Sequence, residues 1–264
     1  MVTLDRPLDF YHYGAATSTA AKYGGVDMRG EVVLLTRNVK IVGNDTEAWG
    51  CQVVTSDFME ANDVWRTGSL ILDSVEIYNC SQYDTFKAAV RFEGNFGSWS
   101  KISSSAIHHG LGIGIQFTAG NNVLMKDNTI YNFVRFGVNI QSSSNITIDG
   151  NLIGDINSRN LFVLDGAIDV EAGILGCALE EGDRCQDIFI LNNIVAGTTT
   201  TGYSAYAHEC NDYSKKVFFN NTAHSVDGNG AIIFRNPSSD KQGECLEGSF
   251  FTAYKCTSAG AVTY

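Results

Sequence analysis

Three titratable side chains have types and positions that could cleave a polysaccharide. Asp169 and Glu171 alternate within one strand-like segment, and His208 lies in a similar segment further along the chain. Two carboxyl groups on one face of a strand can act as the acid and the base, or nucleophile, in glycosidic bond cleavage. An imidazole can transfer protons near neutral pH. If the chain is an enzyme, these three residues are the catalytic candidates.

The same strand face carries polar and aromatic side chains that could bind a glycan without cleaving it. Side chains alternate along a strand, so Val90 and Phe92 should point inward while their neighbours point outward. Arg91 and Asn139 are expected in a row beside these candidates. The glycan-binding candidates are Glu93, Gln116, Gln141, Tyr206 and Arg235. A solvated sheet face is polar without any ligand, so an enzyme, a binding module and a plain surface are all open alternatives.

Two adjacent histidines, His108 and His109, raise the question of a metal site. Neighbours in a regular strand face opposite sides, so both imidazoles should not reach one ion from one face. The Gly-rich segment 110–115 begins a strand rather than a helix, which argues against a phosphate-binding loop. We therefore predict no metal site and no cofactor.

The cysteines and the glycosylation sequons indicate an extracellular chain. Cys177 and Cys185 lie eight residues apart around an acidic loop and are predicted to form a disulfide, while Cys51 and Cys80 could stack or form another. The remaining three cysteines leave one thiol over. Such cysteine usage is typical of oxidising compartments. The N-glycosylation candidates are Asn44, Asn79, Asn145 and Asn220.

Net charge and the lengths of the apolar runs argue against two classes of partner, nucleic acids and the membrane interior. The 264 residues include 18 basic and 29 acidic side chains, for a formal net charge of −11. Nucleic-acid binding needs a basic surface that neutralises phosphates, and this chain has none in its composition. There is also no run of 18 apolar residues, so we predict no nucleic-acid partner and no direct membrane insertion of this segment.

A repeat indicates how these residues are positioned. The segments "NVLMKDNTIYN", "NITIDGNLIGD" and "DIFILNNIVAG" align at Asn128, Asn151 and Asn193, and weaker copies extend the series at intervals of 23 to 42 residues. These weaker copies align at Ser74, Ser104, Asn221 and Lys255. A second strand, usually introduced by Gly, lies between them, and no helical crossover returns the chain. We predict an all-β fold, a right-handed parallel β-helix with pectate-lyase-like coils.

In a β-helix, a residue that recurs once per coil lies about 4.8 Å from its counterpart in the next coil. Asn128, Asn151 and Asn193 should then form an Asn ladder through their side-chain amides. We expect residues 1–30 to be an N-terminal cap or the tail of a preceding β module. Residues 31–264 should form about seven to eight coils that continue beyond this segment.

Two stretches near the N-terminus, "VDMRGEVVLLTRNVKIVG" (26–43) and "WGCQVVTSDF" (49–58), resemble the fibrocystin and fibrocystin-like family. They are similar to its junction between an eight-glycine β module and parallel β-helix repeats. "RFGVNIQSSSNITIDGNLIGDI" is similar to those repeats and, more distantly, to cell-surface hyaluronidases. The resemblance implies an extracellular protein, often large and membrane-anchored. The hyaluronidase branch degrades a polysaccharide, but no catalytic motif of that branch is matched here.

The sequence thus favours an extracellular structural, adhesive or fibre-forming segment without catalysis. Its expected partners are other coils of a longer chain, or further copies stacked end to end. The alternative is a polysaccharide hydrolase or lyase, or a glycan-binding module, which would use the outward face of the second strands.

Overall fold

The computed structural model describes residues 26, 28–44, 49–94, 97–158, 171–177, 185–209, 217–234 and 246–263; for 208, 209, 246 and 247 only the backbone is described. The chain divides into two units, Met1–Leu34 and Leu35–Tyr264. In the first unit, residues 26 and 28–34 have no regular secondary structure. No described segment forms a helix that could cross a bilayer.

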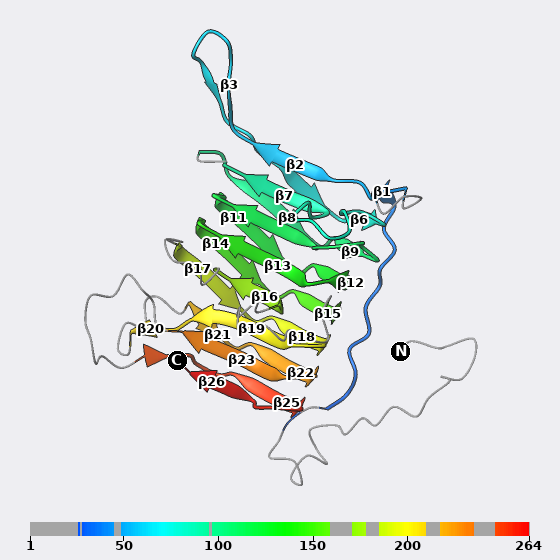
Figure 1. Cartoon of the computed structure of the whole chain (residues 1–264), viewed down its shortest axis with the longest axis vertical. Coiled ribbons are helices and arrows are strands. Elements are labelled where there is room, and N and C mark those ends of the chain that lie inside the picture. Colours follow the sequence, from blue (N-terminus) through cyan, green and yellow to red (C-terminus); the bar gives the residue numbers. More distant parts are fainter. Residues whose placement is uncertain are drawn as a thin grey trace. The chain divides into compact units, whose positions relative to one another are not determined.

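Leu35–Tyr264 coils through three parallel sheets, whose strands lie one below another (Figure 1). The first sheet contains β1 (Val39–Val42), β6 (Val75–Tyr78), β9 (Ala106–His108), β12 (Thr129–Val134), β15 (Leu152–Asn157), β18 (Ile194–Thr198), β22 (Thr222–Val226) and β25 (Thr252–Cys256). The second contains β2 (Val53–Ser56), β7 (Val90–Glu93), β10 (Ile115–Thr118), β13 (Phe136–Gln141), β16 (Ala172–Gly176), β19 (Thr201–Tyr206), β23 (Asn229–Phe234) and β26 (Ala261–Thr263). The third contains β5 (Ile71–Asp73), β8 (Ser100–Ser103), β11 (Asn121–Lys126), β14 (Ser144–Asp149), β17 (Gln186–Leu191) and β21 (Phe218–Phe219).

Two short antiparallel pairs are added to the coils. β3 (Phe58–Met59) pairs with β4 (Trp65–Arg66) in a hairpin that follows β2 and projects from the coils in Figure 1. β20 (His208–Glu209) pairs with β24 (Leu246–Glu247), and so joins the segments that follow β19 and β23. Both pairs therefore extend from the ends of second-sheet strands.

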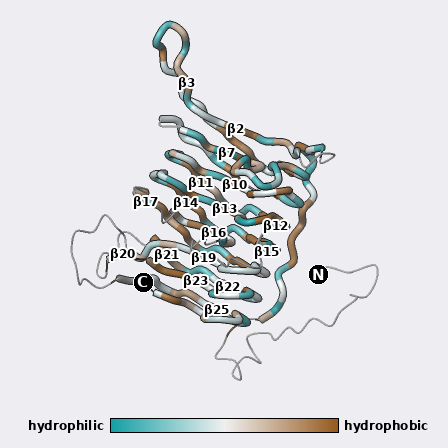
Figure 2. Tube along the Cα trace, viewed as in Figure 1, coloured by the Kyte–Doolittle hydropathy of each residue, from teal (hydrophilic) through white to brown (hydrophobic). Residues whose placement is uncertain are grey.

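The core lies inside the coils and is built by stacking like residues. Ile130 lies opposite Ile107 on one side and Ile153 on the other, and all three side chains are fully buried. Figure 2 shows apolar positions alternating with polar ones along the strands. This period-2 pattern directs every second side chain inward, where burial of apolar surface stabilises the stack. The predicted parallel β-helix is confirmed.

The Asn ladder is also confirmed, and it is longer than predicted. The side-chain oxygen of Asn151 accepts hydrogen bonds from the backbone N–H and the side-chain amide of Asn128, at 3.0 and 2.9 Å. The side-chain oxygen of Asn193 accepts the same two hydrogen bonds from Asn151, at 2.9 and 3.0 Å. Asn221 continues the ladder below Asn193, and Ser105 occupies the position above Asn128.

The alignment of the weaker copies at Ser74, Ser104 and Lys255 was wrong. Asn128 lies in register with Ser105, and the residue before each ladder position has a left-handed backbone, with φ of 49° at Ser104 and 54° at Asp127. Lys255 lies at a different bend, in β25, also with a positive φ. Each turn therefore combines a residue with a left-handed backbone and the ladder residue that follows it. The predicted alignment placed Ser74 and Ser104 one residue before the ladder position, and Lys255 four residues after it.

A column of glycines begins the second-sheet strands. A Cβ on Gly137 would lie 2.7 Å from the carbonyl oxygen of Gly173 and 2.5 Å from Ile153 Cγ2. Such distances are shorter than real side chains tolerate, so this position has no room for a methyl group. The members of the column are Gly114, Gly137, Gly173, Gly202 and Gly230, each facing the carbonyl of the glycine in the next coil.

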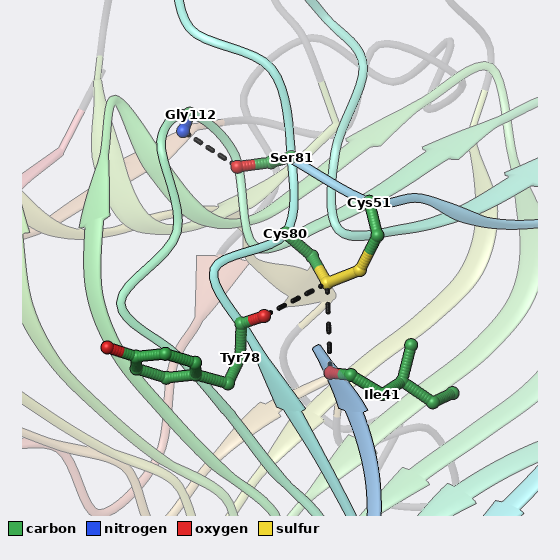
Figure 3. The surroundings of a disulfide bond; sticks show 6 residues. All are labelled: Ile41, Cys51, Tyr78, Cys80, Ser81 and Gly112. Atoms are coloured by element: carbon green, nitrogen blue, oxygen red, sulfur yellow. Dashed lines mark hydrogen bonds between the residues drawn. A yellow bond between two sulfur atoms is a disulfide. The ribbon is translucent and has the colours of Figure 1, made fainter. Parts of the chain in front are cut away.

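Two disulfides connect described residues. Cys177 and Cys185 are bonded, as predicted, and Cys51 bonds to Cys80, which decides between the two alternatives for that pair. Figure 3 shows the second bridge beside Ser81, whose hydroxyl accepts a 2.7 Å hydrogen bond from the Gly112 backbone N–H. Among described cysteines, Cys256 is free. Cys210 and Cys245 lie outside the described residues.

Candidate functional site

The outward face of the second sheet carries two rows of polar residues, and Gln116 belongs to a different row from the one predicted. Gln116 lies opposite Arg91 and Asn139. Glu93 and Gln141 belong to a row two residues further along the strands, with Thr118 between them. The prediction placed Gln116 in the row of Glu93 and Gln141 because strand-like segments of different lengths were aligned by composition rather than by register.

These polar side chains bond to one another. Asn139 donates a 2.8 Å hydrogen bond to the Gln116 side chain, which in turn donates to Gln141 at 3.2 Å. Arg91 forms an ion pair with Glu93 and donates to the side chain of Gln52 at 2.8 Å. Gln116 and Asn139 are each only 1% exposed, whereas Glu93 and Gln141 are partly exposed. Gln116 and Asn139 therefore cannot contact a glycan directly, whereas Glu93 and Gln141 can.

Glu171 is not in this polar row. β16 begins one residue after it, and the position in register with Asn139 belongs to Leu175. The Glu171 carboxylate is buried and lies 3.4 Å from Arg135 Nε. The Glu171 side chain is therefore covered by Arg135 and does not lie with the polar residues of the second sheet.

The other candidates are separated or fall outside the described chain. The backbone of His208 belongs to β20, and its side chain is not described; Asp169 and Arg235 lie outside the described residues altogether. Tyr206 ends β19, opposite Phe234, and is partly exposed. β19 is the second strand after β13 in this sheet, so Tyr206 and Gln141 do not lie on adjacent strands. The structure thus brings together Glu93, Gln116 and Gln141 among the predicted residues.

The glycosylation candidates differ in exposure. Asn44, Asn145 and Asn220 are exposed, whereas Asn79 is half-buried and precedes the buried residues Cys80 and Ser81. Asn79, Asn145 and Asn220 have left-handed backbones with φ of 53°, 53° and 52°. Asn tolerates this conformation better than most residues, so the bends of the coil by themselves account for Asn at these three sites.

A cluster of ionisable groups on the first sheet was not predicted. The Glu76 carboxylate is 6% exposed; it accepts hydrogen bonds from the Arg37 backbone N–H at 2.8 Å and from Lys40 Nζ at 3.1 Å. Burial alone would raise the pKa of Glu76, but these two bonds lower it below its ordinary value. The carboxylate therefore remains ionised, and it lies 3.7 Å from the Nε2 atom of His108.

His108 and His109 belong to this cluster, and their geometry overturns the strand argument made from the sequence. His109 has a φ of 52°, so its side chain is not opposed to that of its neighbour, and the two Nδ1 atoms lie 2.7 Å apart. The repeats contain a signal for this bend, because the residues in line with His109 are of types that favour it: Asn79, Asn132, Asp155 and Gly197. Within the described chain, no group of three or more His, Cys, Asp or Glu residues could hold a metal ion.

Comparison with known proteins identifies the family. Residues 66–242 match the family model described as right handed beta helix region, which covers most of the coils seen in Figure 1. The chain belongs to the right handed beta helix family. This assignment agrees with the stacked parallel sheets and the Asn ladder.

Within the right handed beta helix family, the chain is similar to fibrocystins. It is 25% identical to mouse Fibrocystin over 252 residues, which is 95% of this chain and 6% of that protein. It is 27% identical to human Fibrocystin-L over 246 residues, or 85% of this chain and 6% of that protein. The chain therefore spans about 6% of the length of these relatives. HetL, a pentapeptide repeat protein from Nostoc of known structure, is 10% identical, covers 74% of this chain and 89% of its own, and has a TM-score of 0.15.

Proposed function

We propose that this chain is a stiff, non-catalytic segment of an extracellular protein, with a structural or adhesive role. The observation that carries the proposal is the uninterrupted stacking from coil to coil. The Asn ladder runs from Asn128 to Asn221, and the glycine column runs beside it. Repeats that contact only their neighbours in this way form an extended and rigid body.

Two further observations support the proposal. In the described part of the second sheet's outward face, Asn139, Gln116 and Gln141 bond to one another and Glu93 is paired with Arg91, while Glu171 is buried against Arg135. The two disulfides favour an oxidising location. The similarity to fibrocystins supports the same role.

The proposal predicts that the purified chain does not cleave polysaccharides. Acidic and neutral polysaccharides would be incubated with it, and reducing ends and unsaturated sugars measured. We expect no release above a heat-denatured control. Cleavage that disappears in Glu171→Gln or His208→Ala would contradict the proposal and favour the enzyme alternative. Binding without cleavage, weakened by Glu93→Gln but not by Asp73→Asn on the third sheet, would favour a glycan-binding module.

The adhesive part of the proposal concerns the C-terminal coil. Among described strands, β25 pairs only with β22, and β26 only with β23, so both present an open edge to which a further strand can add. An apolar cavity of 170 Å³ lies beside this edge. Its lining residues are Ala207, Phe218, Ile233, Gly248, Phe251, Ala261 and Thr263. We propose that another coil, from the same longer protein or from a second copy, covers this end.

Self-association tests this contact. Light scattering at increasing concentration should show the chain forming larger species, because copies can add at the open edge. Ala261→Asp should reduce this association, since it places a charge on the edge strand β26. Asp187→Asn, a surface substitution on β17, is the control and should leave association unchanged. A chain that stays monomeric at all concentrations would contradict stacking of free copies.

A further inference from the structure

We propose that the His108–His109 pair is a pH-sensitive switch, which holds β1 in place at neutral pH and loosens it in acid. The Nδ1 atoms of the two rings lie 2.7 Å apart, and the ring centroids 5.0 Å apart, which is the geometry of a ring-to-ring hydrogen bond. One proton fits between two such nitrogens, whereas two protons repel each other. This hydrogen bond is therefore the part of the switch that responds to acid.

Glu76 connects the histidine pair to the first coil. Its carboxylate accepts hydrogen bonds from the Arg37 backbone N–H at 2.8 Å and from Lys40 Nζ at 3.1 Å. Arg37 also donates from Nε to Ser104 O at 2.8 Å. Among described strands β1 pairs only with β6, whereas inner strands of the sheet have a neighbour on each side. The attachment of β1 therefore depends on these polar contacts more than that of an inner strand does.

The two rings take up protons in two steps. A proton on His108 Nε2 faces the Glu76 carboxylate, so His109 is the donor between the rings. The exposed ring of His109 takes the first additional proton at its Nε2 atom, and the hydrogen bond survives. The second must go to Nδ1 of His108, where it meets the Nδ1 proton of His109. The hydrogen bond then breaks, and both rings carry a positive charge.

This second proton changes the partners of Glu76. Its Oε1 atom, which accepts the bond from Lys40, lies 3.7 Å from His108 Nε2, and that nitrogen has no hydrogen bond to a described atom. His108 is 6% exposed, so a positive charge on its ring is poorly solvated and attracts the carboxylate strongly. Glu76 then exchanges its contacts with Lys40 and Arg37 for a charged hydrogen bond to His108, and β1 is loosened.

The surroundings of the pair determine the pH of this step. Burial lowers the pKa of His108 below its ordinary value, and the charge of His109 lowers it further, whereas Glu76 opposes the shift. The two cationic side chains act in the same direction as His109, and the two phenols are uncharged in acid. The groups that face the pair are those of Arg37, Lys40, Glu76, Tyr78 and Tyr131.

Acid opens the switch because the folded protein binds this proton less readily than the unfolded chain does. An unfolded chain takes it up near the ordinary histidine pKa of about 6.5, whereas the folded pKa of His108 is lower. The contribution of the switch to stability is therefore complete above about pH 6.5 and is lost as the pH falls through the folded pKa. This inference does not depend on the proposed structural role.

Hydrogen exchange of the purified full chain, followed by mass spectrometry, tests the switch. Exchange is measured at several values between about pH 7.5 and about pH 5, which lie on both sides of the ordinary histidine pKa. After correction for the chemical exchange rate, protection of residues 37–42 should fall by about tenfold or more in acid. Strand β14, inside the third sheet, should keep its protection, since the opening is local.

Two histidine variants should respond differently. His109→Asn should move the midpoint of the loss to higher pH by about one unit, because no second charged ring then opposes protonation of His108. This variant should keep the fold, since Asn79 and Asn132 occupy the same bend in other coils. His108→Gln should abolish the pH dependence, because glutamine does not titrate. Circular dichroism at neutral pH checks that each variant is folded.

His224→Gln is the matched control. This histidine is also buried on the outward face of the first sheet, stacked on Tyr254 at 4.7 Å, but its strand β22 is not adjacent to β9. We expect its pH profile for residues 37–42 to equal that of the unmodified chain. The proposal is overturned if that protection does not change with pH, if β14 loses protection to the same extent, or if His109→Asn leaves the midpoint where it was.

Discussion

Replacing Asn151 by alanine is expected to lower the free energy of unfolding by about 4 kcal/mol. Its side-chain oxygen accepts two hydrogen bonds from Asn128, and its amide donates to Met125 O and to the Asn193 side chain. All these groups lie in the interior, where water cannot replace the lost partner. An unsatisfied buried donor or acceptor costs about 1–3 kcal/mol, and this substitution leaves several.

Denaturant unfolding followed by circular dichroism measures this effect. Asn157→Ala is the matched control, because Asn157 is exposed at the end of the same strand, β15, and its side chain contacts only Asp155 among the hydrogen bonds described for it. We expect this control to change stability by about 0.5 kcal/mol or less. If both variants lower the free energy of unfolding by the same amount, the ladder amide of Asn151 stabilises the protein no more than the exposed amide of Asn157.

Gly137→Ala should destabilise the protein by about 3 kcal/mol, although it adds only one methyl group. The new Cβ would lie 2.7 Å from Gly173 O and 2.5 Å from Ile153 Cγ2. The first contact is with backbone of the next coil, which cannot move without changing the separation of the two strands. Overpacking of a well-packed interior costs about 1–3 kcal/mol, and a rigid backbone neighbour places this site at the upper end.

Gly154→Ala is the control for this prediction. It also lies in a strand, but its nearest neighbour to a new Cβ is Ala196 O at 3.5 Å, an ordinary contact. Alanine there should be neutral or slightly stabilising, since it reduces the freedom of the unfolded chain. Equal thermal unfolding temperatures for the two variants would show that the glycine column tolerates side chains.

The recurring glycines predicted that second strands exist, but not always which residues form them. Their recurrence before apolar segments predicted second strands. The strand-like segment that contains Asp169 and Glu171 was taken as one of them, whereas the second-sheet strand of this coil is β16, Ala172–Gly176. The error arose because an insertion precedes this strand, and "GAIDVEA" and "AGILG" both match the pattern. Register with β13 selects the latter, and Glu171 consequently leaves the polar face.

The sequence by itself determined the fold, the Asn ladder and the Cys177–Cys185 disulfide. Each depends on residues that recur at matching positions, or lie close together, and in a solenoid a local repeat is also the three-dimensional contact pattern. The tertiary structure alone decided which outward residues are covered and which pairs of side chains meet. Gln116 is buried among its neighbours, and His109 faces His108, because strand register and one left-handed residue per bend set side-chain direction. Composition and spacing do not specify either of these two features at single-residue precision.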